Sequence, residues 1–250
     1  MINVVCVKTG TKYDYEFVNR LYRMVEKNLS LPFDFYCLTE MSDGIRKEVK
    51  IVDISEIIEE GIDGFWPKLL VFNPDIYEKV ETTLYLDLDV FVQNSIDYLF
   101  EDINSNKIKI CYGGSDKDLI DIDISNGKFY NTEVNSSIMI FKSDQFKHIF
   151  ENFMINPYSD ISTYKGVCRL LWNEYKDNLE YLKVLEDYYH VLGSSPEMKK
   201  KIGNYKIETF SGKNSSGYKF KPDCAVALMN SNQSNQQWED ILDHFSDYYK

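Results

Sequence analysis

The chain has 250 residues, with 28 basic and 40 acidic side chains and a formal net charge of −12. This acidic balance argues against a protein that binds nucleic acid or anionic membranes without specificity, because such binding needs a positive surface potential. Hydrophobic residues make up 44% and charged residues 27% of the chain, which excludes a wholly disordered protein.

The first part of the chain alternates between apolar strands and a helix. Strands are predicted at residues 2–8, 33–39 and 49–54. A helix is predicted over residues 13–29, where apolar side chains recur at helical spacing, at Val18, Leu21, Tyr22, Val25 and Leu29. This alternation predicts an α/β fold, with a mixed, mainly parallel sheet flanked by helices.

The remainder continues with the same kinds of element. Residues 61–64 are predicted as a loop, residues 66–72 as a helix with Pro67 in its first turn, and residues 82–86 as a buried strand. Later strands are predicted at 107–112, 135–141, 181–185, 206–210 and 225–229. Helices are predicted at 143–153, over most of 159–180 and at 236–249, loops at 193–203 and 211–217, and a long loop or a hairpin at 113–130. We find no repeat or linker, so we expect one domain over residues 1–250.

Targeting and cysteine patterns favour a cytoplasmic protein. No apolar run approaches the roughly 18 residues that span a membrane, so no transmembrane segment is expected. The N-terminus lacks the basic flank and cleavage site of a signal peptide. No pair of cysteines has the C-x-x-C spacing of a zinc site, which favours reduced thiols at Cys6, Cys37, Cys111, Cys168 and Cys224.

Two carboxylates interrupt an otherwise apolar run. Asp87 and Asp89 directly follow the buried strand at 82–86 and alternate with Leu88, so an extended backbone places both on one side. Carboxylates are costly to bury unless they are paired or bind a metal. At the carboxyl end of a parallel strand they would face the crevice where α/β proteins bind ligands, and oxygen ligands suit Mg²⁺ or Mn²⁺. Asp121 and Asp123, in the polar segment 113–130, are instead expected to be solvated.

This segment resembles the D-x-D motif of GT-A glycosyltransferases. Residues 4–8 leading to Tyr13, and residues 19–22, 65–69 and 135–139, resemble further segments of a subgroup of small transferases from bacteria and large DNA viruses. That subgroup is distantly similar to family 8 retaining enzymes. The resemblance is good over residues 1–155 and weak beyond, and it implies a GT-A (Rossmann-like) fold.

The resemblance also implies roles for particular residues. Asp87 and Asp89 would bind a Mn²⁺ or Mg²⁺ cofactor, and Lys68 would approach the diphosphate or donor sugar of a nucleotide sugar. A solvated helix lysine is the alternative interpretation of Lys68. The remaining donor contacts would come from the loop after the first strand, from the D-x-D segment and from the strand at 135–141: Val7, Lys8, Thr9, Tyr13, Asp87, Leu88, Asn135, Ser136 and Ser137.

The C-terminal part departs from the pattern of the resembling family. Where relatives have an acidic, glutamine-containing stretch after Tyr-Arg-Gly, this chain has Val167, Cys168 and Arg169. Where relatives have a metal-binding histidine after the last strand, it has Met229, followed by Asn230. Thioether sulfur is a poor ligand for a hard cation. The three histidines, His148, His190 and His244, are expected to be surface or packing residues.

Three functions remain open from the sequence. The first is a metal-dependent transferase that moves a sugar from a nucleotide sugar, most simply a UDP sugar, to a glycan or other hydroxyl acceptor; the resemblance implies retention of configuration. The second is a non-catalytic nucleotide-sugar binding module, and the third is a nucleotidyltransferase. No catalytic residue is assigned, since no spacing argument separates Glu133, Glu186 and Asp187 as groups near the acceptor.

Overall fold

The computed structural model describes residues 1–92, 95–101, 103, 106–112, 134–182, 189–192 and 226–229, the last two ranges as backbone only. These residues belong to two compact units. The first unit takes its residues from Met1–Val18, Leu31–Leu88 and Leu99–Leu182, and the second from Asn19–Ser30, Asp89–Tyr98 and Lys183–Lys250. Both units combine segments that are distant in the sequence, and the expectation of one domain over residues 1–250 stays a prediction.

A seven-stranded sheet forms the centre of the first unit, in the order β3-β2-β1-β4-β7-β6-β8. Its strands are β1 (Ile2–Lys8), β2 (Phe33–Thr39), β3 (Val49–Asp53), β4 (Thr82–Leu86), β6 (Ile108–Tyr112), β7 (Val134–Lys142) and β8 (Leu179–Tyr181). The pairs β1-β2, β1-β4, β2-β3 and β6-β8 are parallel, whereas β7 is antiparallel to both β4 and β6. The predicted mixed, mainly parallel sheet flanked by helices is confirmed.

The apolar composition of the central strands follows from their position. Val4, Val5 and Cys6 of β1 are fully buried, as are Leu84 and its neighbours in β4. A strand with neighbours on both sides and helices over the sheet has no solvent-facing side, so it carries a continuous apolar run. This is why the predicted bounds of β1, β2 and β4 agree with the structure.

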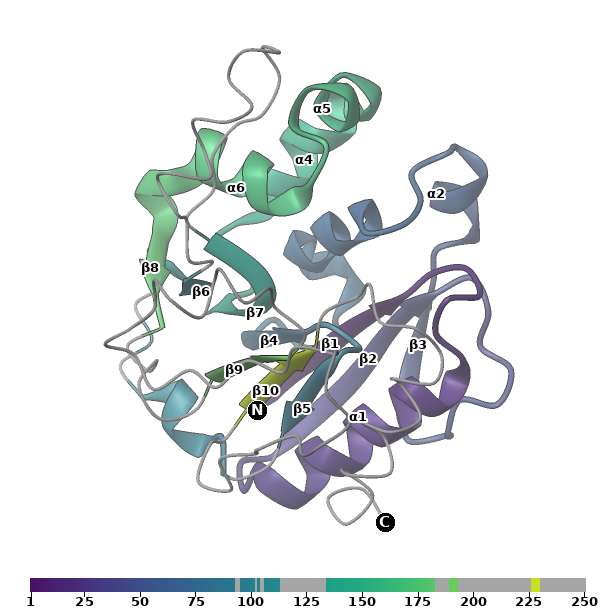
Figure 1. The fold of residues 1–250 in the computed structure, drawn as a ribbon, viewed down its shortest axis with the longest axis vertical. Helices are drawn as coiled ribbons and strands as arrows, with labels where there is room; N and C mark the ends of the chain where they lie inside the picture. The colour runs from purple at the N-terminus through teal and green to yellow at the C-terminus, as the bar shows by residue number, and fades with distance from the viewer. Residues whose placement is uncertain are drawn as a thin grey trace, which may run out of the picture. The chain divides into compact units, whose positions relative to one another are not determined.

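The described helical segments belong to both units. They are α1 (Tyr15–Asn28), α2 (Ser55–Glu59), η1 (Trp66–Phe72), η2 (Pro74–Ile76), η3 (Asp97–Phe100), α4 (Lys147–Ile155), α5 (Pro157–Tyr164), α6 (Val167–Tyr175) and η5 (Lys176–Asn178). Figure 1 shows α4, α5 and α6 gathered beside β7. The indole of Trp66 in η1 stacks on the ring of Phe153 in α4 with 5.7 Å between centroids, which ties η1 to this group.

Some predicted elements differ from the structure. The helix predicted over 66–72 is a 3₁₀-helix, and the short helix α2 was not predicted. The helical stretch predicted over 159–180 is broken at Lys165, which has a left-handed φ of 53° at the end of α5. Strand β8 begins at Leu179, two residues before the strand predicted at 181–185. The elements predicted at 113–130, 193–203, 206–210, 211–217 and 236–249 lie outside the described residues.

The second unit contains a three-stranded sheet in the order β5-β10-β9. Its strands are β5 (Val90–Val92), β9 (Tyr189–Leu192), which was not predicted, and β10 (Val226–Met229), within the strand predicted at 225–229. The C-terminal end of α1 is tied to this unit, because Asn28 Nδ2 donates to the carbonyl of Val92 at 3.2 Å. Ser30 binds the Asp97 carboxylate through both its backbone N–H and its hydroxyl, at 2.8 Å each, which lowers the pKa of Asp97.

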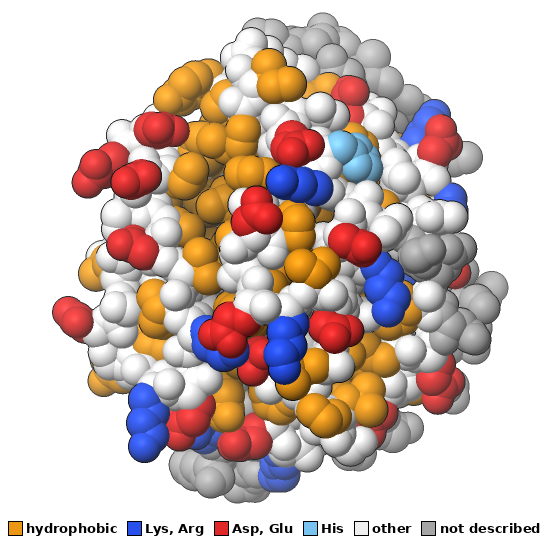
Figure 2. All heavy atoms as spheres, turned by 180° about the vertical axis from the view of Figure 1, so that it is seen from behind, with side chains coloured by type: hydrophobic (Ala, Val, Ile, Leu, Met, Phe, Trp, Pro, Cys, Tyr) orange, Lys and Arg blue, Asp and Glu red, His pale blue; other side chains and the backbone are white. Residues whose placement is uncertain are grey.

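Several apolar side chains remain exposed on the described surface. Figure 2 shows hydrophobic side chains gathered in a hollow on the face opposite to that of Figure 1. Among the described residues, Ile155 and Tyr158 at the junction of α4 and α5 are 81% and 58% exposed, and Phe65 before η1 is 51% exposed. None of the helices in the described part of the chain has the length and apolar character needed to cross a membrane.

Candidate functional site

The strand directions bring distant segments to one edge of the seven-stranded sheet. Strands β1, β2 and β4 are parallel, so their carboxyl ends lie at the same edge. Because β7 runs antiparallel to β4, its amino end lies there too: Leu86 pairs with Ile138, and the backbone N–H of Asp87 donates to the carbonyl of Ser137 at 2.9 Å. Ligands of open α/β sheets bind outside the carboxyl ends of the parallel strands, so a ligand site is expected at this edge.

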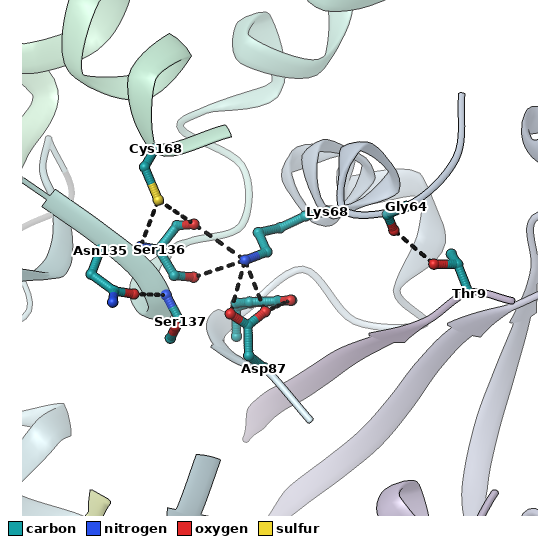
Figure 3. Close-up of polar contacts among 9 residues, drawn as sticks. Thr9, Gly64, Lys68, Asp87, Asn135, Ser136, Ser137 and Cys168 are labelled. Carbon is teal, nitrogen blue, oxygen red and sulfur yellow. Dashed lines mark hydrogen bonds and ion pairs between the residues drawn. The ribbon is translucent and has the colours of Figure 1, made fainter. Parts of the chain in front are cut away.

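Lys68 is buried at this edge and forms an ion pair with Asp87 (Figure 3). Its Nζ lies 2.8 Å from Oδ1 and 3.0 Å from Oδ2 of the Asp87 carboxylate, and the two side chains are only 8% and 25% exposed. The alternative of a solvated helix lysine is therefore wrong. All seven residues of η1 are buried, because the segment packs against β1 on one side and α4 and α6 on the other.

Ser136 completes the surroundings of the Lys68 ammonium. Lys68 Nζ donates to the Ser136 hydroxyl at 3.2 Å and to the Ser136 carbonyl at 3.4 Å. The neighbouring Asn135 side chain accepts the backbone N–H of Ser137 at 2.8 Å, a local turn that shapes the start of β7. Of the predicted residues, Lys68, Asp87, Asn135, Ser136 and Ser137 are thus brought together.

Tyr85 belongs to the same cluster and was not predicted from the sequence. Its hydroxyl donates a hydrogen bond to the Asp87 carboxylate, and its ring centroid lies 5.0 Å from Lys68 Nζ, close enough for a cation–π interaction. Strand alternation contains the signal that would have identified it, since residues two apart on a strand share a side. Tyr85 therefore helps both to orient Asp87 and to surround the ammonium.

The negative charge of Asp87 acts on nearby thiols. Burial raises the pKa of Cys6 well above its usual range, and the charges of Cys37 and Asp87 raise it further. Burial likewise raises the pKa of Cys111, with a further contribution from Asp87. These two thiols are neutral at physiological pH and are structural rather than reactive. Cys168, by contrast, is half-buried and contacts Ser136.

The loop after β1 is held by three hydrogen bonds at the same edge of the sheet. The Thr9 hydroxyl donates to the carbonyl of Gly64 at 2.7 Å (Figure 3), and the Gly10 N–H donates to Glu40 Oε1 at 2.6 Å. The buried Lys8 donates to the carbonyl of Gly10 at 3.4 Å. Gly10 has a φ of 58°, in the left-handed region that favours glycine. Glu40 and Gly64 are thus further residues of this edge that sequence reasoning missed.

The other predicted residues of this edge have apolar or aromatic neighbours. Val7 is half-buried against the core, and Leu88 is 5% exposed. The ring of Tyr13 packs on that of Phe17, with 4.8 Å between centroids, and Lys12 Nζ lies 4.9 Å from the Tyr13 ring. Val7 and Leu88 therefore offer chiefly backbone groups to a ligand.

Removing Glu40 should weaken any ligand binding that depends on this loop. In Glu40→Ala the Gly10 N–H loses its partner, a hydrogen bond worth about 0.5–1.5 kcal/mol, so the affinity for a ligand that this loop holds should fall by roughly two- to tenfold, with uridine diphosphate as the probe that the resemblance suggests. Calorimetric titration measures this change. Glu48→Ala is the matched control, because Glu48 is exposed and pairs with its near neighbour Arg46. Equal affinity of Glu40→Ala and the wild type would remove Glu40 from the site.

Asp89 and Met229 belong to the second unit. Strand β10 is antiparallel to β5, and the last pair of their register is Leu228 with Val90. Met229 follows Leu228 at the end of β10, and Asp89 directly precedes β5. The expectation that Met229 stands where resembling transferases have a metal-binding histidine stays a prediction. His190 is described only as backbone, whereas the exposed His148 packs beside the ring of Tyr175, as expected for a surface residue.

The described residues do not form a self-sufficient metal centre. No group of three histidine, cysteine, aspartate or glutamate side chains among them is placed to hold a metal ion. The Asp87 carboxylate has both oxygens within 3.0 Å of the Lys68 ammonium. Carboxylates suit Mg²⁺ or Mn²⁺, but a dication at Asp87 would need further ligands from outside the described side chains.

Sequence comparisons identify no relative. No protein-family model matches this chain, and no curated protein sequence matches it.

Solved structures nevertheless share its fold. A galactosyltransferase, LgtC, in complex with donor and acceptor sugar analogs is similar with a TM-score of 0.63 and 13% identity, over 99% of this chain and 95% of that one. An active-site mutant of LgtC has a TM-score of 0.58 at 14% identity, over 97% of this chain and 95% of that one. Mouse xyloside xylosyltransferase 1 has a TM-score of 0.54 at 12% identity, over 93% and 98%. The predicted GT-A fold is confirmed, and the resemblance to one subgroup stays a prediction.

Proposed function

We propose that this protein is a glycosyltransferase that moves a sugar from a nucleotide-diphosphate sugar, most simply a UDP sugar, to a hydroxyl acceptor. The observation that carries the proposal is the buried Lys68–Asp87 ion pair at the carboxyl end of β4, with Ser136 beside it. The cluster lies at the ligand-binding edge of a fold shared with the galactosyltransferase that was crystallised with donor and acceptor sugar analogs.

The chemistry of Lys68 supports a diphosphate ligand. An ammonium is a compact point charge that suits phosphate oxygens. Because Lys68 is buried, its electrostatic attraction for them is screened less than it would be in water. Asp87 and Ser136 hold Nζ in place before the ligand arrives. In the proposed reaction Lys68 stabilises the negative charge that develops on the departing nucleoside diphosphate as the bond from the sugar to the phosphate oxygen breaks.

The proposed donor site includes the loop after β1 and the start of β7. The loop residues Val7, Lys8, Thr9 and Tyr13 would meet the nucleoside, and Asn135, Ser136 and Ser137 would line the sugar. Lys8 is buried with its ammonium on the Gly10 carbonyl, so it holds the loop rather than offering a free charge. The loop therefore contributes mainly backbone groups and the side chains of Thr9 and Tyr13.

The proposal includes a Mn²⁺ or Mg²⁺ ion held by Asp89, with Asp87, and by the diphosphate. When bound, such an ion would offset charge on the diphosphate leaving group. The side-chain contacts described above give Asp87 a second role, as counter-ion of Lys68. We expect the metal and the nucleotide to bind together, each strengthening the other by the same factor.

Incubation with a panel of nucleotide sugars and glycan acceptors, followed by mass spectrometry of the products, tests the proposed function. A glycosyltransferase adds one sugar to the acceptor and releases the nucleoside diphosphate. Transfer of the nucleotide instead would identify a nucleotidyltransferase. Tight binding of a nucleotide sugar with neither product would identify a non-catalytic binding module, and no binding of any member of the panel would overturn the proposal.

Met229→His should increase metal affinity. Met229 follows the last β10 residue that pairs with β5, and Asp89 directly precedes β5, so we propose that the two lie close together. Imidazole is a better ligand for Mn²⁺ than a thioether. Titration with Mn²⁺ in the absence of nucleotide should show weak binding by the wild type and at least about tenfold tighter binding by the variant, as expected when a ligand is added. Tight metal binding by the nucleotide-free wild type would contradict this prediction.

A further inference from the structure

The sulfur of Cys168 contacts Ser136 at two points (Figure 3). Cys168 lies in the first turn of α6, and its Sγ is 3.3 Å from the backbone nitrogen and 3.1 Å from the hydroxyl oxygen of Ser136. The side chain is half-buried, whereas Cys6, Cys37 and Cys111 are buried. Cys168 thus brings a partly exposed thiol into contact with the residue that accepts from Lys68.

A β-bulge explains why the Ser136 N–H bonds to sulfur. The register of β6 against β7 shifts between Ile110, which pairs with Met139, and Cys111, which pairs with Asn135. Residues 136–138 of β7 therefore have no partner residue in β6 within the described register. Bulges redirect side chains and occur next to active sites, and here the bulge frees the Ser136 N–H to donate to Cys168 Sγ.

The hydrogen bonds around Ser136 form one connected chain. Lys68 Nζ donates to both oxygens of Ser136, the hydroxyl at 3.2 Å and the carbonyl at 3.4 Å. Since the hydroxyl oxygen accepts from the ammonium, its single proton is available for the sulfur. Cys168 thus holds Ser136 through the backbone and the side chain, and Ser136 presents two acceptors to Lys68. Sulfur is a weak acceptor, so the contacts fix orientation more than they add stability.

We propose that Cys168 is a positioning residue of this site, which acts on Lys68 through Ser136. The thiol fixes Ser136 so that its hydroxyl and its carbonyl both accept from the Lys68 ammonium, which also pairs with Asp87. Lys68 is thereby held between a carboxylate and two neutral oxygens. That the positioned Lys68 binds a diphosphate rests on the proposed function, but the positioning of Lys68 by Ser136 and Cys168 does not.

A double-mutant cycle tests this role with uridine diphosphate as the probe. Cys168→Ala and Ser136→Ala should each weaken binding by about three- to tenfold, the size of a lost neutral hydrogen bond. If the two residues acted independently, their fold-losses of affinity would multiply in the double variant. We expect a smaller loss than that product, because both changes act on one chain of contacts. Cys168→Ser should restore binding, since a hydroxyl can also accept the Ser136 N–H. Independent, multiplying effects would overturn the proposal.

A second measurement keeps the test independent of ligand binding. In protein labelled with ¹⁵N-lysine, the Nζ resonance of Lys68 is assigned by its loss in Lys68→Met. Cys168→Ala should shift this resonance in the ligand-free protein, Cys168→Ser should leave it near the wild-type position, and the control Cys37→Ala should not move it. Thermal unfolding confirms that each variant is folded at the temperature of measurement.

The two measurements separate the two proposals. If the wild type does not bind uridine diphosphate but the Lys68 resonance responds to Cys168→Ala, the donor proposal fails and the positioning of Lys68 stands. If the wild type binds uridine diphosphate but Cys168→Ala changes neither the affinity nor the resonance, Cys168 has no positioning role.

Discussion

Replacement of Lys68 by methionine is expected to destabilise the fold and to weaken nucleotide binding more than any other single change at this edge. Methionine fills a similar volume but leaves the Asp87 carboxylate, 25% exposed, without its counter-ion. Breaking a buried ion pair costs about 3–5 kcal/mol, and the partial exposure of Asp87 reduces our expectation to about 2–4 kcal/mol. Denaturant unfolding followed by circular dichroism measures the change.

The same variant should lose affinity for uridine diphosphate. A hydrogen bond to a charged group is worth about 1.5–3 kcal/mol, so the loss of the ammonium predicts roughly 10- to 150-fold weaker binding. Adding Asp87→Asn to Lys68→Met should restore part of the stability, because the uncompensated charge is removed, but it should not restore binding. Recovery of binding in the double variant would show that Lys68 does not contact the nucleotide.

Lys50→Met is the matched control for Lys68→Met. Lys50 also pairs with carboxylates, Asp34 at 3.2 Å and Glu78 at 2.6 Å, but its side chain is 31% exposed. Ion pairs near the surface contribute about 0–1 kcal/mol, so this variant should be nearly as stable as the wild type. It should bind uridine diphosphate equally well. A comparable loss of stability in both variants would mean that the burial of Lys68 has no special consequence.

The central strands could be predicted because their continuous apolar sequence has a single cause, which is burial on both faces of the sheet. A strand covered on both faces must be apolar throughout, as in β1 and β4, so its ends are marked by the first polar or turn residues. The position of the helix over 66–72 could be predicted from the sequence, but its 3₁₀ geometry could not. Its seven residues are buried by contacts with β1, α4 and α6, and nothing in the local sequence distinguishes a 3₁₀-helix packed in this way from an α-helix.

The residues of the candidate site were predictable, whereas their contacts were not. The resemblance singled out Lys68, Asp87 and Ser136, but the bonds between them join residues 19 and 68 positions apart. Such pairings depend on the antiparallel placement of β7 beside β4, which the sequence does not specify. Tyr85 could have been predicted as a neighbour of Asp87, because residues two apart on a strand share a side. The bulge that turns Ser136 towards Cys168 depends on the register between β6 and β7, and no local signal marks it.

Asp89 is the carboxylate that we propose as the main protein ligand of the metal. Asp89→Asn should abolish the effect of Mn²⁺ on the binding of uridine diphosphate, because the amide keeps the size of the side chain but removes the charge that holds a hard cation. Calorimetry with and without Mn²⁺ measures the effect. Binding in the absence of metal should be unchanged, which separates the loss of a metal ligand from damage to the nucleotide site.

Asp121→Asn and Asp123→Asn are the controls for Asp89→Asn. Both lie in the polar segment 113–130, outside the described residues, whereas Asp89 is half-buried and directly precedes β5. The polar sequence of that segment predicts solvated carboxylates that hold no metal. The controls should therefore keep the full response to Mn²⁺. An equal loss at Asp121 would show that the metal-binding carboxylates lie in that segment instead.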